Sequence, residues 1–302
     1  MHETFQLRSP SWSGNEVNDA TLCGGILRMQ IAKHSGKFFV TLVTALALVV
    51  IALPARAYDD PWPDIQRDVF DNREVIEGDG TITLEAPYRA EVAAIVPLTM
   101  RMPKSIAGDV KKLTLIIDKN PAPIAATFQF GDAAGRGERV ISTRVRIDMY
   151  SNVRAVIETK DGKLHMAAKF VKASGGCSAP ASKDAEAALA NLGKMRIRHF
   201  DPPARANSLP VTRKAQVMIR HPNFSGMQMD QLTREYTPAK FVEELEIKRG
   251  DALVFRMEGG ISISENPNFR FTFDAADDET LHVRAKDTDG SVFTATSLDK
   301  SS

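Results

Sequence analysis

Apolar and polar residues alternate with a period of two along much of the chain. In the first half the alternation is clearest in three runs, at 113–117, 145–149 and 164–170. In the second of these, Val145, Ile147 and Met149 are separated by charged residues. This pattern is typical of half-buried antiparallel strands, which place apolar side chains on one face and polar side chains on the other. Asp161-Gly162 stands between two apolar runs and predicts a hairpin turn.

The second half repeats the pattern. Apolar side chains alternate in runs at 215–219, 253–257, 269–273, 281–285 and 292–296, and turn residues such as those of "DTDGS" separate the last two runs. Short strands with frequent turns favour an all-β fold of two sandwiches over a fold with a parallel sheet.

Between the halves the period changes. In "SKDAEAALANLG", Ser182 is suited to cap a helix and Gly193 is suited to end it. A proline-bearing segment, "HFDPPARANSLP", follows. We therefore expect a short helix and linker at 182–207, between a first sandwich at 58–181 and a second at 208–302.

Residues 1–57 have the character of an upstream extension followed by a signal peptide. Lys33 and Lys37 precede an apolar run from Phe38 to Leu53, and Ala55-Arg56-Ala57 supplies the small residues of a cleavage site. The run is shorter than the ~20 residues needed to cross a bilayer. We expect translation to start at Met29, cleavage before Tyr58, and export; an uncleaved membrane anchor is the alternative.

Charge and cysteine content narrow the function. Without residues 1–57, 34 Lys and Arg face 35 Asp and Glu, so the net charge is near −1. Such a balance gives no electrostatic footprint for nucleic acid or an anionic membrane. Of the two cysteines, only Cys177 follows the expected cleavage site. In an oxidising compartment an odd cysteine indicates intermolecular pairing or a free reactive thiol.

The surroundings of Cys177 predict exposure. "SGGCSAP" offers no large apolar neighbour to bury the thiol, so we expect it on the surface and outside any strand, with few contacts made by Gly175, Gly176 and Ser178. A small buried hydrophobe is the alternative. Lys172 and Lys183 flank the segment and are placed to lower the pKa of the thiol.

No enzymatic constellation accompanies the cysteine. A cysteine nucleophile needs a histidine base oriented by a third group, and His199 has only Asp201 beside it in the expected linker. Phosphate-binding and dinucleotide-binding motifs are absent from the sequence. We expect no enzyme and no cofactor. A rival interpretation is copper(I) binding by His221, Met227 and Met229, because imidazole and thioether ligands suit that ion.

Two stretches resemble known families. The first half, ending in "FVKASGGC", resembles SoxY, and "VMIRHPNFSGMQMD" with "TPAKFVEELEI" and "ISENPNFRFTF" resembles SoxZ. SoxY and SoxZ are the two subunits of a periplasmic sulfur-compound carrier of thiosulfate oxidation. The whole chain is similar to the fused SoxYZ-like carriers associated with quinoprotein dehydrogenases. The resemblance implies two immunoglobulin-like β-sandwiches in the periplasm.

The resemblance also implies a role for the cysteine segment. Cys177 would carry a sulfur-containing intermediate covalently, and Gly175 and Gly176 would give a mobile arm its reach. The implied partners are a periplasmic c-type cytochrome or hydrolase of a sulfur-oxidation system, or a quinoprotein dehydrogenase. The family motif closes the SoxY chain as Gly-Gly-Cys-Gly-Gly, whereas here Ser178-Ala179-Pro180 follow the cysteine and the arm is an internal loop. A non-catalytic adaptor of a quinoprotein dehydrogenase is the alternative function.

Overall fold

The computed structural model describes residues 60–180, 189–200, 212–230, 233–274 and 280–297. Every described residue belongs to one unit, Asp60–Ser302. The expected signal peptide, Cys23 and residues 182–188 of the expected helix therefore lie outside the described residues. Within the described ranges, no helix has the length and apolar character needed to cross a membrane.

The described part is built mainly of strands. The helical elements are α2 (Trp62–Phe70), α3 (Lys104–Ala107) and the 3-10 turn η1 (Asp132–Ala134). The strands of the first half are β1 (Val75–Glu77), β2 (Thr83–Glu85), β3 (Val96–Met102), β4 (Val110–Ile117), β5 (Ile124–Phe130), β6 (Arg139–Val145), β7 (Ser151–Thr159) and β8 (Leu164–Val171). Those that follow are β9 (Met195–His199), β10 (Thr212–Ile219), β11 (Val242–Arg249), β12 (Ala252–Gly259), β13 (Asn268–Asp274), β14 (Leu281–Asp287) and β15 (Val292–Thr296).

The strands form two sheets. One has nine strands in the order β1-β8-β7-β4-β5-β12-β11-β14-β15, and the other has six in the order β2-β3-β6-β13-β10-β9. Neighbouring strands are antiparallel except for β1 and β8. The prediction of an all-β fold of antiparallel strands is confirmed.

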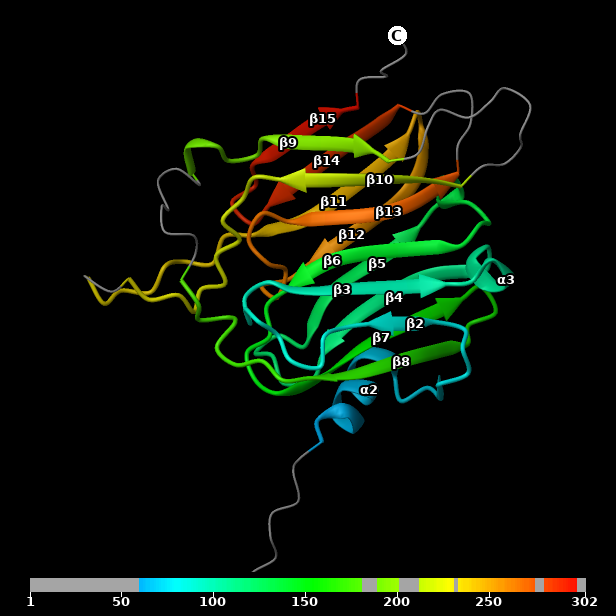
Figure 1. Ribbon diagram of the computed structural model, residues 1–302, viewed down its shortest axis with the longest axis horizontal. Coiled ribbons are helices and arrows are strands. Elements are labelled where there is room, and N and C mark those ends of the chain that lie inside the picture. Colours follow the sequence, from blue (N-terminus) through cyan, green and yellow to red (C-terminus); the bar gives the residue numbers. More distant parts are fainter. Residues whose placement is uncertain (1–59, 181–188, 201–211, 231–232, 275–279, 298–302) are drawn as a thin grey trace, which may run out of the picture. The chain divides into compact units, whose positions relative to one another are not determined.

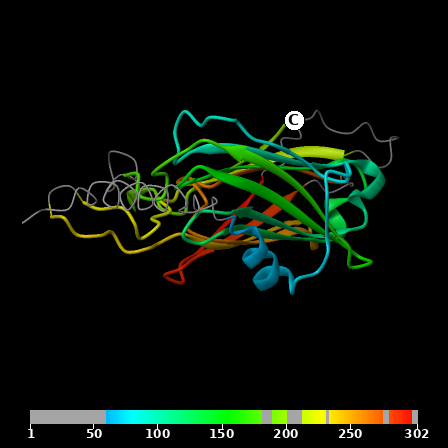
Figure 2. The same ribbon diagram turned by 90° about the horizontal axis from the view of Figure 1, so that it is seen from below.

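The two sheets pack face to face (Figures 1 and 2). A single buried cluster draws its apolar side chains from both sheets, among them Leu98 of β3, Leu115 of β4 and Val217 of β10. These side chains lie on the inward-facing positions that period-two alternation predicts. The core is therefore that of a β-sandwich.

Each sheet continues from the first half of the chain into the second. In the nine-stranded sheet β5 pairs with β12, and in the six-stranded sheet β6 pairs with β13. Between the layers, the ring of Phe128 lies 5.7 Å from that of Phe255 and 6.2 Å from that of Phe269, centroid to centroid. The two sandwiches expected from the sequence are thus joined edge to edge, and their strands form a shared pair of sheets.

Helix α2 covers the outer face of the nine-stranded sheet (Figure 2). Its side chains Ile65 and Phe70 pack on Ile116 of β4, Val156 of β7 and Met166 of β8. Strands β4 and β7 are consequently buried on both faces, beyond what alternation predicts.

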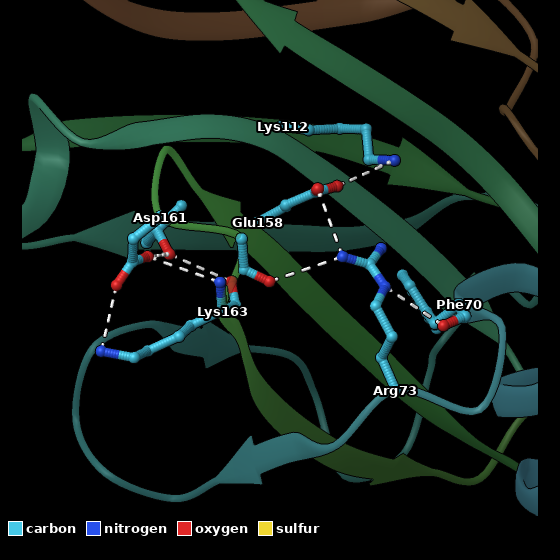
Figure 3. A network of polar contacts seen from close by, with 8 residues as sticks. Phe70, Arg73, Lys112, Glu158, Asp161 and Lys163 are labelled. Atoms are coloured by element: carbon cyan, nitrogen blue, oxygen red, sulfur yellow. Dashed lines mark hydrogen bonds and ion pairs between the residues drawn. The ribbon is translucent and has the colours of Figure 1, made fainter.

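Polar contacts fix the end of α2 to the β7–β8 hairpin (Figure 3). The Arg73 guanidinium donates to the Phe70 carbonyl at 3.2 Å and to the Glu158 carboxylate at 3.4 Å. The other carboxylate oxygen of Glu158 lies 3.2 Å from Lys112 Nζ. The hairpin turn itself, predicted from Asp161-Gly162, is confirmed, and Gly162 has a φ of +85°.

Two expectations differ from the structure. Strand β6 ends at Val145, so residues 146–149 leave the sheet, although their alternation predicted a strand. Residues Met195–His199, expected in a linker, form β9 and pair with β10. Met195 and Ile197 alternate with Arg196 and Arg198, as a strand requires, and the hydrogen-bonding edge of β10 orders this short segment.

Candidate functional site

The segment that follows β8 carries Cys177 and lies outside any strand, as predicted. We call residues 173–180 the cysteine arm. Its backbone follows the residues that continue β6: Gly175 N–H donates to the Asp148 carbonyl at 2.8 Å, and Gly176 N–H donates to the Ile147 carbonyl at 3.0 Å. The N–H of Cys177 donates to Asp148 Oδ1 at 3.3 Å. The arm is therefore docked on the body of the protein.

The two glycines are needed for this docking. Gly175 has a φ of +74°, in the left-handed region that side-chain-bearing residues rarely adopt. A Cβ on Gly176 would lie 2.3 Å from the Ala93 carbonyl oxygen and 2.5 Å from that of Ile147. One glycine permits the turn, and the other permits the close approach of three backbone segments.

The second half of the chain closes over the arm. The Ser225 hydroxyl donates to the Cys177 carbonyl at 2.5 Å. Arg146, which follows β6 and is fully buried, donates from Nη1 to the Gly176 carbonyl at 3.3 Å and from Nη2 to the Asn223 carbonyl at 3.4 Å. The cysteine arm thus lies at the junction of the two halves.

This position controls the chemistry of the thiol. Cys177 is 0% exposed and is a free cysteine. Burial raises the pKa of the Cys177 thiol to about 12, with a further rise from the negative charge of Asp148 and a partial offset by Arg146. The thiolate is the nucleophilic form, so the docked thiol is protonated and unreactive at neutral pH.

The expectation of an exposed, loosely held cysteine is wrong for this conformation. Gly175 and Gly176 are hydrogen-bonded, and Gly176 is buried. Ser178 alone behaves as predicted, since it is exposed and its hydroxyl reaches only the Gly175 carbonyl, at 3.4 Å. Lys172 was expected to lower the pKa of the thiol. Its ammonium group instead packs over the ring of Tyr88, and the pKa of the thiol is set by burial, Asp148 and Arg146.

Three residues of the site were missed by sequence reasoning. Arg146 and Asp148 lie in a run whose alternation placed them on a solvated strand face. Ser225 comes from the distant "HPNFSGMQMD" stretch, which drew attention only as a resemblance and as a candidate copper site. A signal was present at 146–148, where two charged residues of opposite sign, Arg146 and Asp148, follow directly after a strand.

The three candidate copper ligands differ in their surroundings. His221 is buried; its Nδ1 accepts from the Asn223 N–H at 3.0 Å, and its Nε2 lies 3.5 Å from Asp287 Oδ2. Met229 is 42% exposed, and Met227 is partly buried. Nε2 of His221 has no hydrogen-bond partner among the described residues. Among the described residues no cluster of three His, Cys, Asp or Glu suits a metal ion.

Comparison with known families agrees with this geometry. Residues 66–177 match the sulfur oxidation protein SoxY, and residues 204–297 match the sulphur oxidation protein SoxZ. The chain is a SoxYZ-like fusion. The SoxY match ends at Cys177 itself, and the SoxZ match contains Ser225 and Asn223. In this SoxYZ-like chain the contacts over the cysteine arm are therefore contacts between a SoxY domain and a SoxZ domain.

Among solved structures, the chain is similar to the sulfur carrier protein SoxY from Chlorobium limicola f thiosulfatophilum. The identity is 26%, the match covers 37% of this chain and 91% of that chain, and the TM-score is 0.30. No curated protein matches the chain.

Proposed function

We propose that this SoxYZ-like chain is a periplasmic carrier that holds a sulfur-containing group covalently on Cys177 and presents it to partner enzymes. The observation that carries the proposal is the position of Cys177: it ends the SoxY match and stands on an arm between the two halves. It is also the free cysteine of the described residues.

The docked conformation is the resting state of this carrier. Loading requires the arm to leave the body, which breaks the hydrogen bonds to Asp148, Ile147 and Ser225. In water the thiol regains an ordinary pKa near ~8.5, so a useful fraction becomes thiolate. At ~3.3–3.6 Å per extended residue, five or six residues of arm move the sulfur on the order of 15–20 Å.

The loading step is an oxidation. Joining the Cys177 thiolate to the sulfur of a second thiol-like anion forms one S–S bond and releases two electrons. A c-type cytochrome is suited to accept them one at a time, and a hydrolase would act afterwards by adding water across a bond of the attached group. A quinoprotein dehydrogenase is the other candidate partner. The chain itself supplies the sulfur, the arm and the docking surface, and it carries out no catalysis.

Mass spectrometry of the intact protein, purified from the cells that produce it, tests the proposal. We expect a sulfur-containing addition on Cys177 that is absent from a Cys177→Ser variant, and we expect that variant to lose function in those cells. Absence of any addition would contradict the proposal. N-terminal sequencing of the same sample tests export: a start at or near Tyr58 is expected, and residues before Met29 would contradict it.

A non-catalytic adaptor is the second candidate, and the complete burial of Cys177 favours it. An adaptor would keep its function in the Cys177→Ser variant, whereas a carrier would lose it.

A further inference from the structure

Positive charge is concentrated on one sheet of the second half. Strands β9, β10 and β13 contain five Lys and Arg residues, two in β9, two in β10 and one in β13, and one acid, Asp274. In the opposite sheet, β11, β12 and β14 contain five Lys and Arg residues and five Asp and Glu residues. The charge of Asp274 acts on the buried Arg139 of β6. Strands β9, β10 and β13 therefore carry an excess of positive charge.

Three arginines of these strands lie on the outer face of the six-stranded sheet. Arg196 and Arg198 of β9 and Arg270 of β13 are exposed, and they alternate with residues that pack in or against the core, such as Ile197 and Phe269. Among the described elements, no helix covers these strands, since α2 lies against the nine-stranded sheet (Figures 1 and 2). We call the outer side of β9, β10 and β13 the basic face.

The arginines of the basic face lack the ion pairs that other cations of the molecule have. In the nine-stranded sheet, Arg256 and Lys286 each pair with a glutamate. Within the described ranges, Arg196, Arg198 and Arg270 form no ion pair. Like charges gathered on one face repel one another unless a counter-charge joins them. The arrangement therefore favours a partner that supplies negative charge.

Arg270 is held in a conformation suited to such a partner. Its guanidinium lies over the ring of Phe200, 4.2 Å from the centroid. Phe200 follows β9 and is 43% exposed. Stacking fixes the guanidinium plane and leaves the N–H donors at its edge able to bind a carboxylate through two parallel hydrogen bonds. Arginines and aromatic residues are also the types that are enriched at protein interfaces.

Strand pairing sets the spacing of the arginines. Arg198 lies opposite Gln216, and Gln216 lies opposite Arg270. Neighbouring strands are ~4.8 Å apart and successive outward residues of one strand are ~7 Å apart, so the backbone of Arg198 is ~10 Å from that of Arg270 and ~7 Å from that of Arg196. A single small anion does not span such distances, whereas a protein surface with several carboxylates does.

We propose that the basic face is a docking surface for an acidic patch on a partner protein, with Arg196, Arg198 and Arg270 binding its carboxylates. A folded protein fits better than a nucleic acid or a membrane. The chain after residue 57 has a net charge near −1, so the rest of its surface does not attract an extended polyanion. The inference goes beyond the proposed carrier function, which assigns no residues to partner docking, and it does not depend on what Cys177 holds.

A fluorescein-labelled decaglutamate peptide tests the proposal by fluorescence anisotropy with the full chain. We expect saturable binding at about 20 mM salt, and binding at least about tenfold weaker at about 150 mM salt, where screening is stronger. The triple variant Arg196→Gln, Arg198→Gln and Arg270→Gln should bind the peptide about tenfold more weakly at low salt, because each exposed charge contact contributes a factor of about two to five. Its Tm should stay within about 2 °C of the unmutated value, since the substituted side chains are exposed.

A second triple variant, Lys248→Gln, Arg256→Gln and Arg284→Gln, is the matched control. It removes the same number of positive charges from the opposite sheet, where each of the three cations is paired with a glutamate. This control should bind the peptide within about twofold of the unmutated chain. The single variants Arg198→Gln and Arg270→Gln should each weaken binding about two- to fivefold, and they decide the matter if the first triple variant does not fold.

Failure of the unmutated chain to bind the peptide at about 1 mM would overturn the proposal, as would equal losses of affinity in the two triple variants. Tighter binding to phosphatidylserine vesicles or to a single-stranded oligonucleotide than to the peptide, lost in the first triple variant, would also overturn it, because the basic face would then serve a membrane or a nucleic acid. Cys177 is unloaded throughout. A failure of the carrier function would instead appear as the absence of any natural addition on Cys177.

Discussion

At the scale of single residues, the thiol of Cys177 combines complete burial with a pKa of about 12. Compared with an ordinary thiol, this pKa lowers the thiolate fraction at neutral pH by about three orders of magnitude. We expect a small thiol reagent to label Cys177 at least about 100-fold more slowly in the native Cys23→Ser protein than in denaturant, since reaction has to await arm opening. A native rate within tenfold of the denatured rate would show that the arm is undocked.

Gly176 offers a sharper test at the same scale. Gly176→Ala places a methyl group against the carbonyls of Ala93 and Ile147, at distances that real Cβ atoms do not show. The arm should undock, and the labelling of Cys177 should accelerate to within a few-fold of its rate in denaturant. Gly108→Ala is the control, because a Cβ there makes only ordinary contacts, and labelling should stay slow. If glycines served reach alone, Gly176→Ala would leave labelling unchanged.

His221 predicts a dependence of stability on pH. Burial lowers the pKa of His221 below 6.5, while Asp287 acts in the opposite direction. As pH falls below about 6.5, the unfolded chain binds a proton that the folded chain refuses, so the free energy of unfolding decreases with a slope of up to about 1.4 kcal/mol per pH unit. Urea unfolding between pH 7.5 and 5.5 measures this slope. His221→Gln should remove it, and His282→Gln, at an exposed site, should preserve it.

At the scale of elements, the arm is held by a hydrogen bond from the other half of the chain. Ser225→Ala deletes the donor to the Cys177 carbonyl, a bond worth about 0.5–1.5 kcal/mol, so native labelling of Cys177 should become about 2- to 10-fold faster. Ser178→Ala removes a hydroxyl that contacts only the arm itself and should leave the rate unchanged. An equal effect of both substitutions would mean that the arm opens without parting from the second half.

The strands were largely predictable, because their cause is local. Alternation located β4, β8, β10, β13 and β14, and the turn at Asp161-Gly162 joins β7 to β8 as expected. In β15 the prediction assigned the wrong residues to the inner face. Phe293 and Ala295 are partly buried, whereas Val292 is exposed. In β9 the same alternation covers only the five residues MRIRH, which is too short to stand out within a segment expected to be a linker.

The docked arm could not be predicted in this way. Its residues are small and polar, which favours exposure when they are considered alone. Cys177 is buried because Arg146, Ser225 and backbone carbonyls distant in sequence supply hydrogen bonds and cover it. The motif led to the proposal that Cys177 is a carrier cysteine, but its burial in the structure depends on tertiary contacts.

At the scale of the whole molecule, the continuous sheets imply that the SoxY and SoxZ halves unfold together. Phe128 is buried between the two sheets, and its ring contacts those of Phe255 and Phe269. These contacts cross the seam, which is the junction of the two halves where β5 pairs with β12 and β6 pairs with β13. Phe128→Ala should cost about 3–5 kcal/mol, a large share of the ~5–15 kcal/mol that stabilises a typical domain. Hydrogen exchange of β7–β8 and of β14–β15 should report the same loss, because neither half retains its sheets without the other. Phe170→Ala removes a partly exposed ring from β8. It should change the free energy of unfolding, and the opening free energies from hydrogen exchange in both hairpins, by less than about 1 kcal/mol. A loss confined to β7–β8 in Phe128→Ala would instead identify the halves as independent domains, and the seam would then be a docking contact that can open to release the arm.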